Sequence, residues 1–476
     1  MYTIAKLQEM LRKKEVSAVE VTQEYLCTID KKDGQIGAFL SITKEQALDQ
    51  AKKADALIAK EEITPLTGIP CAIKDNICTK GINTTCASKM LEDFIPPYDA
   101  FVMNKLNDNH IVMLGKLNMD EFGMGSSNEN SYFKIVRNPR NLEYVPGGSS
   151  GGAAAAVAAE EVVFALGSDT GGSIRQPASF CGVVGMKPTY GTVSRNGLVA
   201  FASSFDQIGP ITKTVRDSAI ILNAIVGKDK NDSTSIERVY DDFTTDLEKG
   251  VTGITIAVPK EYFGDGISDE VKTAIMNATK VYEKQGATIK EVSLPSLKLA
   301  LPAYYVISGA EASSNLSRFD GIRYGYRTSE YENIEELYKK SRSEGFGDEV
   351  KRRIMLGAFA LSAGYYDAYY KKAVEVRELI KMEFKAIFKD AHAIISPVAP
   401  TTAYKIGQKS NNPVEMYMGD IYSVPINIAG VPAISIPCGE DSLGLPIGMQ
   451  LIGDMFSEKL LYQIANAYER EAKSYV

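Results

Sequence analysis

The chain has 476 residues, of which 45% are hydrophobic and 24% are charged, as is usual for a globular protein with a sizeable core. Its formal net charge of −7 argues against nucleic-acid binding by this chain alone, because phosphate binding relies on clustered lysine and arginine side chains. The small-residue segment from Ala153 to Ala159 is far shorter than the ~20 apolar residues of a membrane span, so we expect no membrane insertion.

The N-terminal part of the chain is predicted to alternate helices with strands. Three helices come first: one from Ile4 to Leu11, one that follows the capping box from Ser17 to Glu20, and one from Thr43 to about Lys60. Next come a strand within Gly68 to Ile77, a helix from Asp99 to Leu106, a short strand from Ile111 to Leu114, and loops over Met119 to Asn130 and Asn138 to Asn141. The first strand is expected to leave Lys74 near its exposed end.

Two glycine and serine clusters, Gly147 to Gly152 and Gly167 to Ser173, dominate the middle of the chain. Between them, Ala153 to Ala159 is a strong helix former, and Val162 to Leu166 is typical of a buried strand. Glycine has no Cβ and lets backbone N–H groups approach another atom closely. The two clusters are therefore predicted to form loops that converge on something small.

The C-terminal half is predicted to continue the alternation and then to become mostly helical. The expected elements are an irregular segment from Val193 to Ile211, helices over Val215 to Ala224 and Asp269 to Gln285, strands over Ile254 to Val258 and Thr288 to Val292, a helical region from Leu297 to Lys389, strands over Ala393 to Ser396, Ala433 to Pro437 and Ile447 to Ile452, and a helix from near Ser457. Within the helical region, Tyr365, Tyr366, Tyr369 and Tyr370 recur at helical spacing, which favours a packing role.

Alternating strands and helices predict a parallel or mixed sheet that is covered on both faces. No internal repeat and no low-complexity linker interrupts the pattern. We therefore expect the α/β class and a single large α/β/α domain over residues 1–476, with a mixed central sheet.

Three interpretations compete for the glycine clusters. They can serve tight packing alone, since glycine is common in turns. A phosphate-binding loop is excluded in detail, because neither cluster is followed by Gly-Lys. Gly147 to Gly151 matches the nucleophile pattern G-x-S-x-G, but Pro146 stands where a strand should end, and that pattern requires a histidine.

The two histidines, His110 and His392, each lie beside an apolar run and favour a packing role. A serine nucleophile then needs another base, and lysine is the known substitute. Lys74 follows a short apolar stretch that would bury its stem. The six cysteines form no C-x-x-C pair, so we expect no metal site, and with no secretory signal the sequence favours the cytoplasm.

Three stretches carry a resemblance to a known family: Gly147 to Gly152, Gly167 to Ala178 (GSDTGGSIRQPA) and Gly68 to Asp75 (GIPCAIKD). They resemble the motifs of the amidase signature family, and the likeness extends over nearly the whole chain. Two further segments, Asp320 to Arg327 and Ser341 to Arg353, are similar to the glutaminase subunits of tRNA-dependent amidotransferases rather than to free-standing amidases.

The resemblance implies a large α/β/α fold whose catalytic core lies in residues 60–220, with a helical substrate-pocket region at about 297–389. It assigns Ser173 as the nucleophile, Lys74 as the ultimate base and Ser149 as the relay between them, with a cis peptide bond before Ser149. Backbone N–H groups of the loop, from Thr170, Gly171, Gly172 and Ser173, are implied as oxyanion donors. Lys74 would need a lowered pKa, which burial beside Ile69, Ala72 and Ile73 makes plausible.

For the substrate, the resemblance implies glutamine, or asparagine, held by Arg353 at its α-carboxylate and by Asp420 at its α-ammonium group, with Tyr304 close by. A solvated arginine on a basic helix face is the alternative for Arg353. The resemblance also implies a heterotrimer with subunits B and C, in which a partner subunit uses ATP and Mg²⁺ and meets the tRNA. This chain itself would need no cofactor. A free-standing amidase and a catalytically silent scaffold remain the alternative functions.

Overall fold

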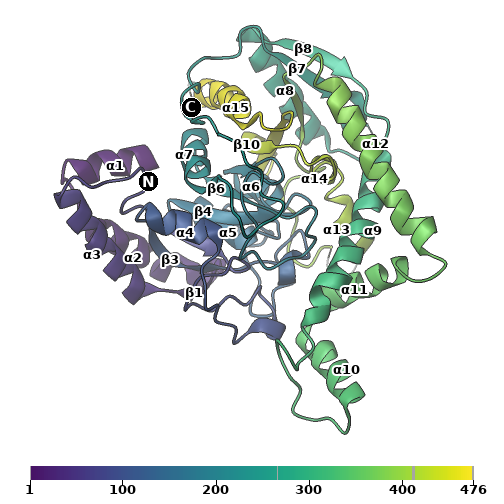
Figure 1. Ribbon diagram of the computed structural model, residues 1–476. Helices are drawn as coiled ribbons and strands as arrows, with labels where there is room; N and C mark the ends of the chain where they lie inside the picture. Colours follow the sequence, from purple (N-terminus) through teal and green to yellow (C-terminus); the bar gives the residue numbers. More distant parts are fainter. Residues whose placement is uncertain (1, 265, 410–412, 474–476) are drawn as a thin grey trace.

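A computed structural model describes residues 2–264, 266–409 and 413–473, and Figure 1 shows one large sheet between layers of helices. The strands are β1 (Phe39–Ile42), β2 (Pro70–Lys74), β3 (Val112–Leu117), β4 (Phe164–Asp169), β5 (Val184–Lys187), β6 (Gln207–Thr212), β7 (Thr255–Pro259), β8 (Thr288–Val292), β9 (Ala393–Pro397), β10 (Ala433–Glu440) and β11 (Pro446–Ile452). The helices are α1 (Ile4–Arg12), α2 (Ala18–Ile36), α3 (Lys44–Ala59), α4 (Phe101–Asp108), α5 (Gly151–Ala158), α6 (Arg175–Cys181), α7 (Val215–Ile225), α8 (Asp269–Lys284), α9 (Leu297–Asn315), α10 (Ile334–Gly345), α11 (Asp348–Ala360), α12 (Lys372–Ile387), α13 (Pro413–Met418), α14 (Val424–Ala429) and α15 (Glu458–Lys473).

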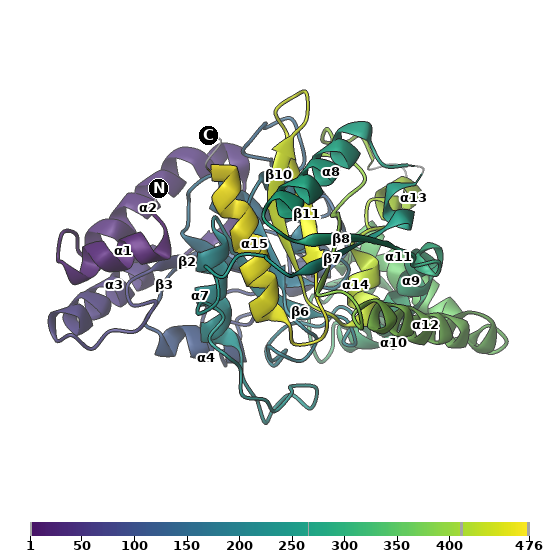
Figure 2. The ribbon, with the colours of Figure 1, turned by 90° about the horizontal axis from the view of Figure 1, so that it is seen from above.

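All these strands join in one sheet, in the order β1-β3-β2-β4-β6-β5-β10-β11-β9-β7-β8. The pairs β2/β3, β2/β4, β7/β8 and β7/β9 are parallel, and the other neighbouring pairs are antiparallel. Helices α7, α8 and α15 form one layer, while α5 and α6 pack on the opposite face (Figures 1 and 2). The predicted fold class, a mixed sheet covered by helices, is confirmed.

Local signals in the sequence placed many of the elements correctly. The Ser17 side chain accepts the Glu20 N–H group, and the Glu20 carboxylate accepts the Ser17 N–H group at 2.8 Å, so the predicted capping box begins α2. The predicted strand Thr288–Val292 is β8, and the predicted helix from near Ser457 is α15. Strong caps and clear periodicity explain these successes.

Around the two glycine clusters the sequence prediction was incomplete. The segment from Val193 to Ile211 was expected to be irregular, but its end forms the fully buried strand β6, and the prediction had no counterpart for β5 or α6. A Cβ on Gly209 would lie 2.0 Å from the carbonyl oxygen of Met186 on β5, so this glycine permits close strand pairing. The glycine that suggested irregular structure is thus required by the sheet.

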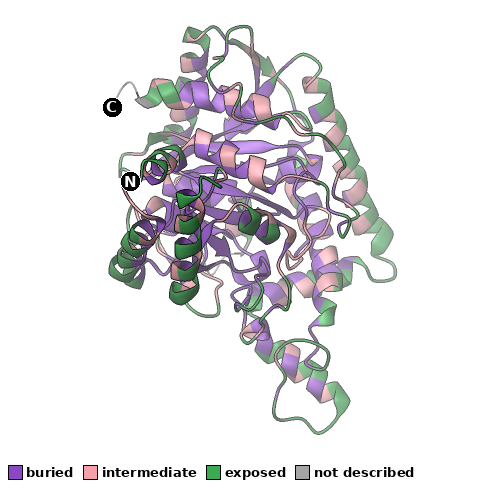
Figure 3. Cartoon of the chain, turned by 60° about the vertical axis from the view of Figure 1, so that its left-hand side comes forward, coloured by how far each residue is buried: buried purple, intermediate pink, exposed green. Residues whose placement is uncertain are grey.

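The region from Leu297 to Lys389 is mainly helical, as predicted, and contributes α9, α10, α11, a π-helical turn at Tyr366–Lys371 and α12. Helices α9, α11 and α12 surround a second apolar cluster with α14, while the main core lies around the sheet, whose central strands are buried in Figure 3. The tyrosine stripe packs, but not in the core: Tyr365, Tyr366 and Tyr369 are 43%, 46% and 47% exposed, and the rings contact one another and Phe359. Helical spacing aligned these rings on one face, but that face is turned to solvent.

Candidate active site

The carboxyl ends of two parallel strands bring the candidate catalytic residues together. Strand β2 ends at Lys74, and its parallel neighbour β4 ends at Asp169. The carboxyl ends of neighbouring parallel strands lie at the same edge of a sheet, and ligand-binding and active sites are usually found at that edge. The loop from Thr170 to Ser173 follows β4 there, and the first glycine cluster leads into α5 beside it.

Lys74 lies at the centre of a cluster of serine oxygens. Its Nζ is 2.7 Å from Ser149 Oγ, 2.8 Å from Ser150 Oγ and 3.0 Å from Ser168 Oγ. The peptide bond between Gly148 and Ser149 is cis. The expectation that Lys74 lies near an exposed end is wrong, because its side chain is 0% exposed beneath the two loops.

Burial determines the charge state of Lys74. Desolvation lowers its pKa to about 7, against the opposing effect of the carboxylates of Asp120, Asp169 and Asp206. A large share of Lys74 is therefore neutral at physiological pH and able to accept a proton. The surrounding hydroxyl groups supply the polar contacts that a buried amine needs.

Ser173 ends the glycine loop and remains 8% exposed. Its carbonyl oxygen accepts the N–H group of Ser150 at 3.0 Å, which joins the two glycine clusters directly. Within the described chain, the Ser173 hydroxyl has no hydrogen-bond partner, while that of Ser149 contacts Lys74. Ser173 is thus the more accessible of the two serines, and Ser149, 1% exposed, lies deeper, beside the amine.

The loop amides differ in their availability to an oxyanion. The N–H group of Gly172 donates to Asp169 Oδ1 at 2.9 Å, so it is already occupied, contrary to the expectation that it faces the substrate. In the described part of the chain, the amides of Thr170, Gly171 and Ser173 donate to no protein acceptor. The Thr170 hydroxyl is held by Asp206 at 2.6 Å.

A crossing of two helices brings the candidate substrate-binding residues together. A Cβ on Gly357 of α11 would lie 1.8 Å from the carbonyl oxygen of Gly309 on α9, so the two backbones touch. Tyr305 and Arg353 each stand one helical turn before these glycines. The Arg353 guanidinium lies 4.7 Å from the Tyr305 ring centre and is only 3% exposed. The alternative of a solvated arginine is therefore wrong.

Arg353 and Asp420 are connected through Tyr305. The hydroxyl group of Tyr305 donates to Asp420 Oδ2 at 2.9 Å, and Ser126 donates to the same carboxylate at 2.9 Å. Burial raises the pKa of Asp420 to about 6, against these two hydrogen bonds. Arg353 also forms an ion pair with Glu349, with Nε 2.7 Å from Oε1.

Tyr304 lies at the junction between this pocket and the glycine loop. It is 3% exposed, and a Cβ on Gly171 would lie 2.6 Å from its hydroxyl oxygen. Its ring is 5.2 Å from that of Tyr305. The three expected pocket residues are therefore buried around one region that adjoins Ser173's loop.

Several residues of the site were missing from the sequence prediction. Ser150 and Ser168 also contact Lys74, at 2.8 and 3.0 Å. Tyr305 rather than Tyr304 joins Arg353 to Asp420, and Ser126 donates a hydrogen bond to Asp420. Ser150 and Ser168 stood within the recognised clusters and could have been found there. No local pattern distinguishes Tyr305 from its neighbour, because the rotation of α9 decides which ring faces the pocket.

Among the described residues, no group of three or more histidine, cysteine, aspartate or glutamate side chains has the arrangement of a metal site. No helix in the described ranges is long and apolar enough to cross a membrane. Cys71, next to the site on β2, is fully buried, and desolvation raises the pKa of its thiol above the usual range. It packs as a small apolar side chain.

A buried amine, serine hydroxyls and free loop amides at one sheet edge are the groups that the class of serine hydrolases with lysine in place of histidine requires. The family model named Amidase matches residues 20–462, and the chain belongs to the amidase family. It is 58% identical to the A subunit of glutamyl-tRNA(Gln) amidotransferase of Caldanaerobacter subterraneus subsp. tengcongensis over 471 residues, which cover 99% of this chain and 96% of that protein.

Solved structures agree with this assignment. The crystal structure of the A subunit of glutamyl-tRNA(Gln) amidotransferase from Thermotoga maritima is 44% identical, with a TM-score of 0.81, over 98% of this chain and 94% of that chain. A bacterial aryl acylamidase of the amidase signature family is 26% identical, with a TM-score of 0.87, over 98% of this chain and 96% of that chain. The same fold therefore serves a translation enzyme and an amidase of another kind.

Proposed function

We propose that this chain is the glutamine-hydrolysing subunit of a tRNA-dependent amidotransferase. The observation that supports this most is the combination of the Lys74 serine cluster with an adjoining pocket in which a buried cation, Arg353, held by Glu349, lies near a buried anion, Asp420. A free amino acid carries the opposite pair of charges at its α-carbon. The likeness to amidotransferase subunits extends over nearly the whole chain and favours glutamine over another amide.

The reaction begins with attack of Ser173 Oγ on the side-chain carboxamide carbon of glutamine. The Ser173 proton passes to Ser149, whose own proton moves to neutral Lys74 Nζ. Loop amides stabilise the oxyanion. Collapse of the intermediate breaks the C–N bond, and the proton on Lys74 returns to the leaving nitrogen, which leaves as ammonia. Water then hydrolyses the acyl ester, and glutamate is released.

The partners of this chain follow from the same proposal. Subunits B and C complete a heterotrimer, and a partner subunit uses ATP and Mg²⁺ to activate the acyl group of Glu-tRNA(Gln), or Asp-tRNA(Asn), which the ammonia then amidates. The tRNA meets this chain only indirectly, which agrees with its net charge of −7. The complex works in the cytoplasm.

The decisive experiment traps the acyl group. The chain is purified with its co-expressed partners, supplied with glutamine and hydroxylamine, and assayed for ammonia and glutamyl hydroxamate. In a separate measurement, mass spectrometry of a slow variant locates the acylated residue. We expect an adduct on Ser173 alone. An adduct on Ser149, Ser150 or any cysteine would refute the assignment. Amidation of Glu-tRNA should require the partner subunits. Hydrolysis of unrelated amides by this chain alone would favour a free-standing amidase. The absence of any amide hydrolysis would favour a catalytically silent scaffold.

Arg353→Ala and Asp420→Ala should each weaken the interaction with glutamine by ~2–5 kcal/mol, because truncation leaves one charge of the bound amino acid unpaired in a buried site. The measurement is kcat/KM for glutamine and for a small amide without α-substituents. The small amide should be affected far less. Lys351→Ala serves as the control, since this neighbouring side chain is 38% exposed and pairs with Asp348 rather than with Glu349, the partner of Arg353. Equal losses on both substrates would assign Arg353 and Asp420 to folding or catalysis.

The pH profile should separate the base from the pocket. As the pH falls through about 7, Lys74 gains a proton. A plot of log(kcat/KM) against pH should therefore fall with a slope of one for any amide substrate. Below about pH 6, Asp420 is also protonated, so the slope for glutamine approaches two while that for the small amide stays at one. Equal slopes for the two substrates across this range would contradict the role of Asp420.

A further inference from the structure

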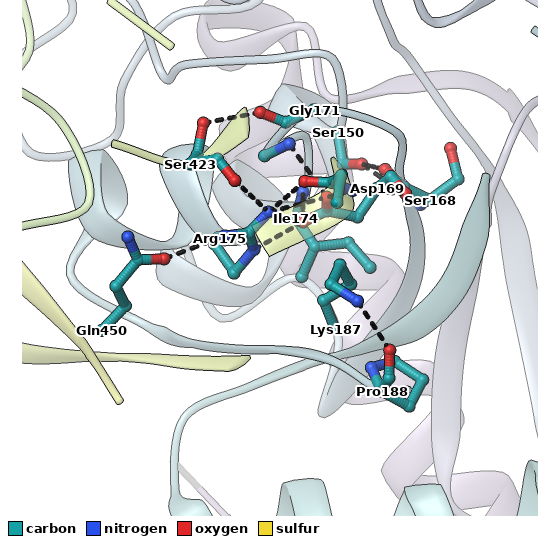
Figure 4. Close-up of polar contacts among 12 residues, drawn as sticks. Ser150, Ser168, Asp169, Gly171, Ile174, Arg175, Lys187, Pro188, Ser423 and Gln450 are labelled. Atoms are coloured by element: carbon teal, nitrogen blue, oxygen red, sulfur yellow. Dashed lines mark hydrogen bonds and ion pairs between the residues drawn. The ribbon is translucent and has the colours of Figure 1, made fainter. Parts of the chain in front are cut away.

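The glycine loop is held by a buried network that no sequence motif indicated. Asp169 accepts the N–H groups of Gly172 and Ile174 at 2.9 and 3.2 Å, and both its oxygens are bound by the Arg175 guanidinium. Arg175 in turn reaches Gln450 on β11 and the carbonyl oxygen of Ser423 (Figure 4). The Asp169 and Arg175 side chains are both 0% exposed.

Ser423 stands where this network meets the substrate pocket. Its hydroxyl group donates to the carbonyl oxygen of Gly171 at 2.5 Å, a contact visible at the top of Figure 4. Its N–H group donates to the carbonyl oxygen of Asp420 at 3.1 Å, and its own carbonyl oxygen accepts from Arg175. All three polar groups of this one residue are therefore engaged, with the loop, the pocket segment and the network.

The peptide group between Gly171 and Gly172 is consequently fixed at both ends. Its carbonyl oxygen accepts from Ser423, and its N–H group donates to Asp169. Gly172 has φ +129°, and a Cβ on it would lie 2.3 Å from Ser423 Oγ, so only glycine permits this contact. With the central N–H group turned to Asp169, the flanking amides of Gly171 and Ser173 stay available beside the nucleophile.

We propose that Ser423 is a positioning residue for acyl transfer. Its hydroxyl group sets the orientation of the Gly171–Gly172 peptide, so that the amides of Gly171 and Ser173 form the oxyanion site. The inference rests on the proposed role of Ser173. Ser423 belongs to the segment that begins at Asp420, so this segment holds the glycine loop in place. The residue that binds the α-ammonium group and the residue that positions the oxyanion amides therefore lie in the same short segment.

Ser423→Ala keeps the Cβ and removes only the hydroxyl group. We expect kcat for glutamine to fall by about 10-fold or more, less than the ~10²–10³-fold typical of deleting an oxyanion donor itself. KM should change by less than about twofold, because the hydroxyl group bonds to the backbone carbonyl oxygens of Gly171 and, at 3.2 Å, of Asp420, and not to a pocket side chain. A loss confined to KM, or an unchanged kcat, would overturn the proposal.

A second readout makes the test independent of the proposed substrate. Phosphonylation of Ser173 by a small alkyl fluorophosphonate also places negative charge on an oxygen facing the loop, and it needs neither glutamine nor a partner chain. We expect its rate to fall in Ser423→Ala by a factor similar to that in kcat. If the unaltered protein is phosphonylated but does not hydrolyse glutamine, the proposed function fails while the role of Ser423 is still measured.

The control is Ser218→Ala on α7, which removes another fully buried hydroxyl group, bonded to Tyr462 far along the chain. It should lower the melting temperature comparably and leave kcat and phosphonylation unchanged. If Ser423→Ala and Ser218→Ala lose equal activity, the role of Ser423 is structural only, and the proposal is wrong. If Ser423→Ala does not fold, Ser423→Cys, which keeps a weaker donor of similar size, is measured against the same criteria.

Discussion

Replacing Lys74 with arginine should reduce glutamine hydrolysis by at least about 10³-fold while the chain stays folded, the range expected for loss of a general base. Arginine keeps the positive charge but does not release its proton at physiological pH. The desolvation that lowers the pKa of Lys74 to about 7 cannot bring a guanidinium to neutrality there. The measurement is ammonia release by the assembled complex.

A second variant, Lys74→Met, guards against failure through packing alone. Methionine keeps an unbranched stem in the fully buried space and carries no charge. We expect the same loss of activity as in Lys74→Arg, with a cooperative thermal transition retained. If Lys74→Arg hydrolyses glutamine nearly as fast as the unaltered chain, the general base lies elsewhere. If Lys74→Arg is active and Lys74→Met is not, the role of Lys74 is purely electrostatic.

Replacing Ser173 with alanine should abolish hydrolysis, with a loss of about 10⁴-fold or more, because the acyl group then has no acceptor oxygen in reach. Glutamine should still bind, since Arg353 and Asp420 remain. The measurements are ammonia release and the dissociation constant of glutamine by calorimetry. A loss of binding as large as the loss of turnover would show that the variant has damaged the pocket.

The matched control for Ser173→Ala is Ser179→Ala on the following helix, α6. Ser179 is also buried, and its hydroxyl oxygen accepts the N–H group of Gly448, away from Lys74. It should cost stability and leave turnover nearly unchanged. Ser150→Ala is informative too, because Ser150 contacts Lys74 as closely as Ser149 does. Hydroxamate formation should persist in that variant.

The candidate site could be located from the sequence because its parts lie in short, unusual stretches. Two glycine and serine clusters, with no histidine motif nearby, led to Lys74 through the known substitution of lysine for histidine. The roles of Ser149 and Ser173, however, came from resemblance to a family. Without that resemblance, the glycine clusters could equally be loops that serve tight packing or a nucleophile turn of the G-x-S-x-G type.

The pocket was less predictable, because its residues come from distant segments of the chain. Arg353, Tyr305 and Asp420 meet only because α9 and α11 cross at Gly309 and Gly357 and because α14 follows Asp420 back to the sheet. A single charged residue on a helix carries no local sign of whether it will be buried. The exposed tyrosine stripe gives the converse case, since its helical spacing suggested burial, whereas its rings pack on one another at the surface.

Local signals in the sequence are sufficient to predict the α/β class, most caps and periodic elements, and the stretches that carry the chemistry, because these depend on neighbours within a few residues. Four features follow only from the folded chain: the complete burial of the Lys74 amine, the hydrogen bond from the Gly172 amide to Asp169, the bond from Tyr305 to Asp420, and the contact of Ser423 with Gly171. Desolvation and hydrogen-bond direction depend on segments that are distant in the chain: Gly171 and Ser423 are 252 residues apart, and Ser126 and Asp420 are 294 residues apart.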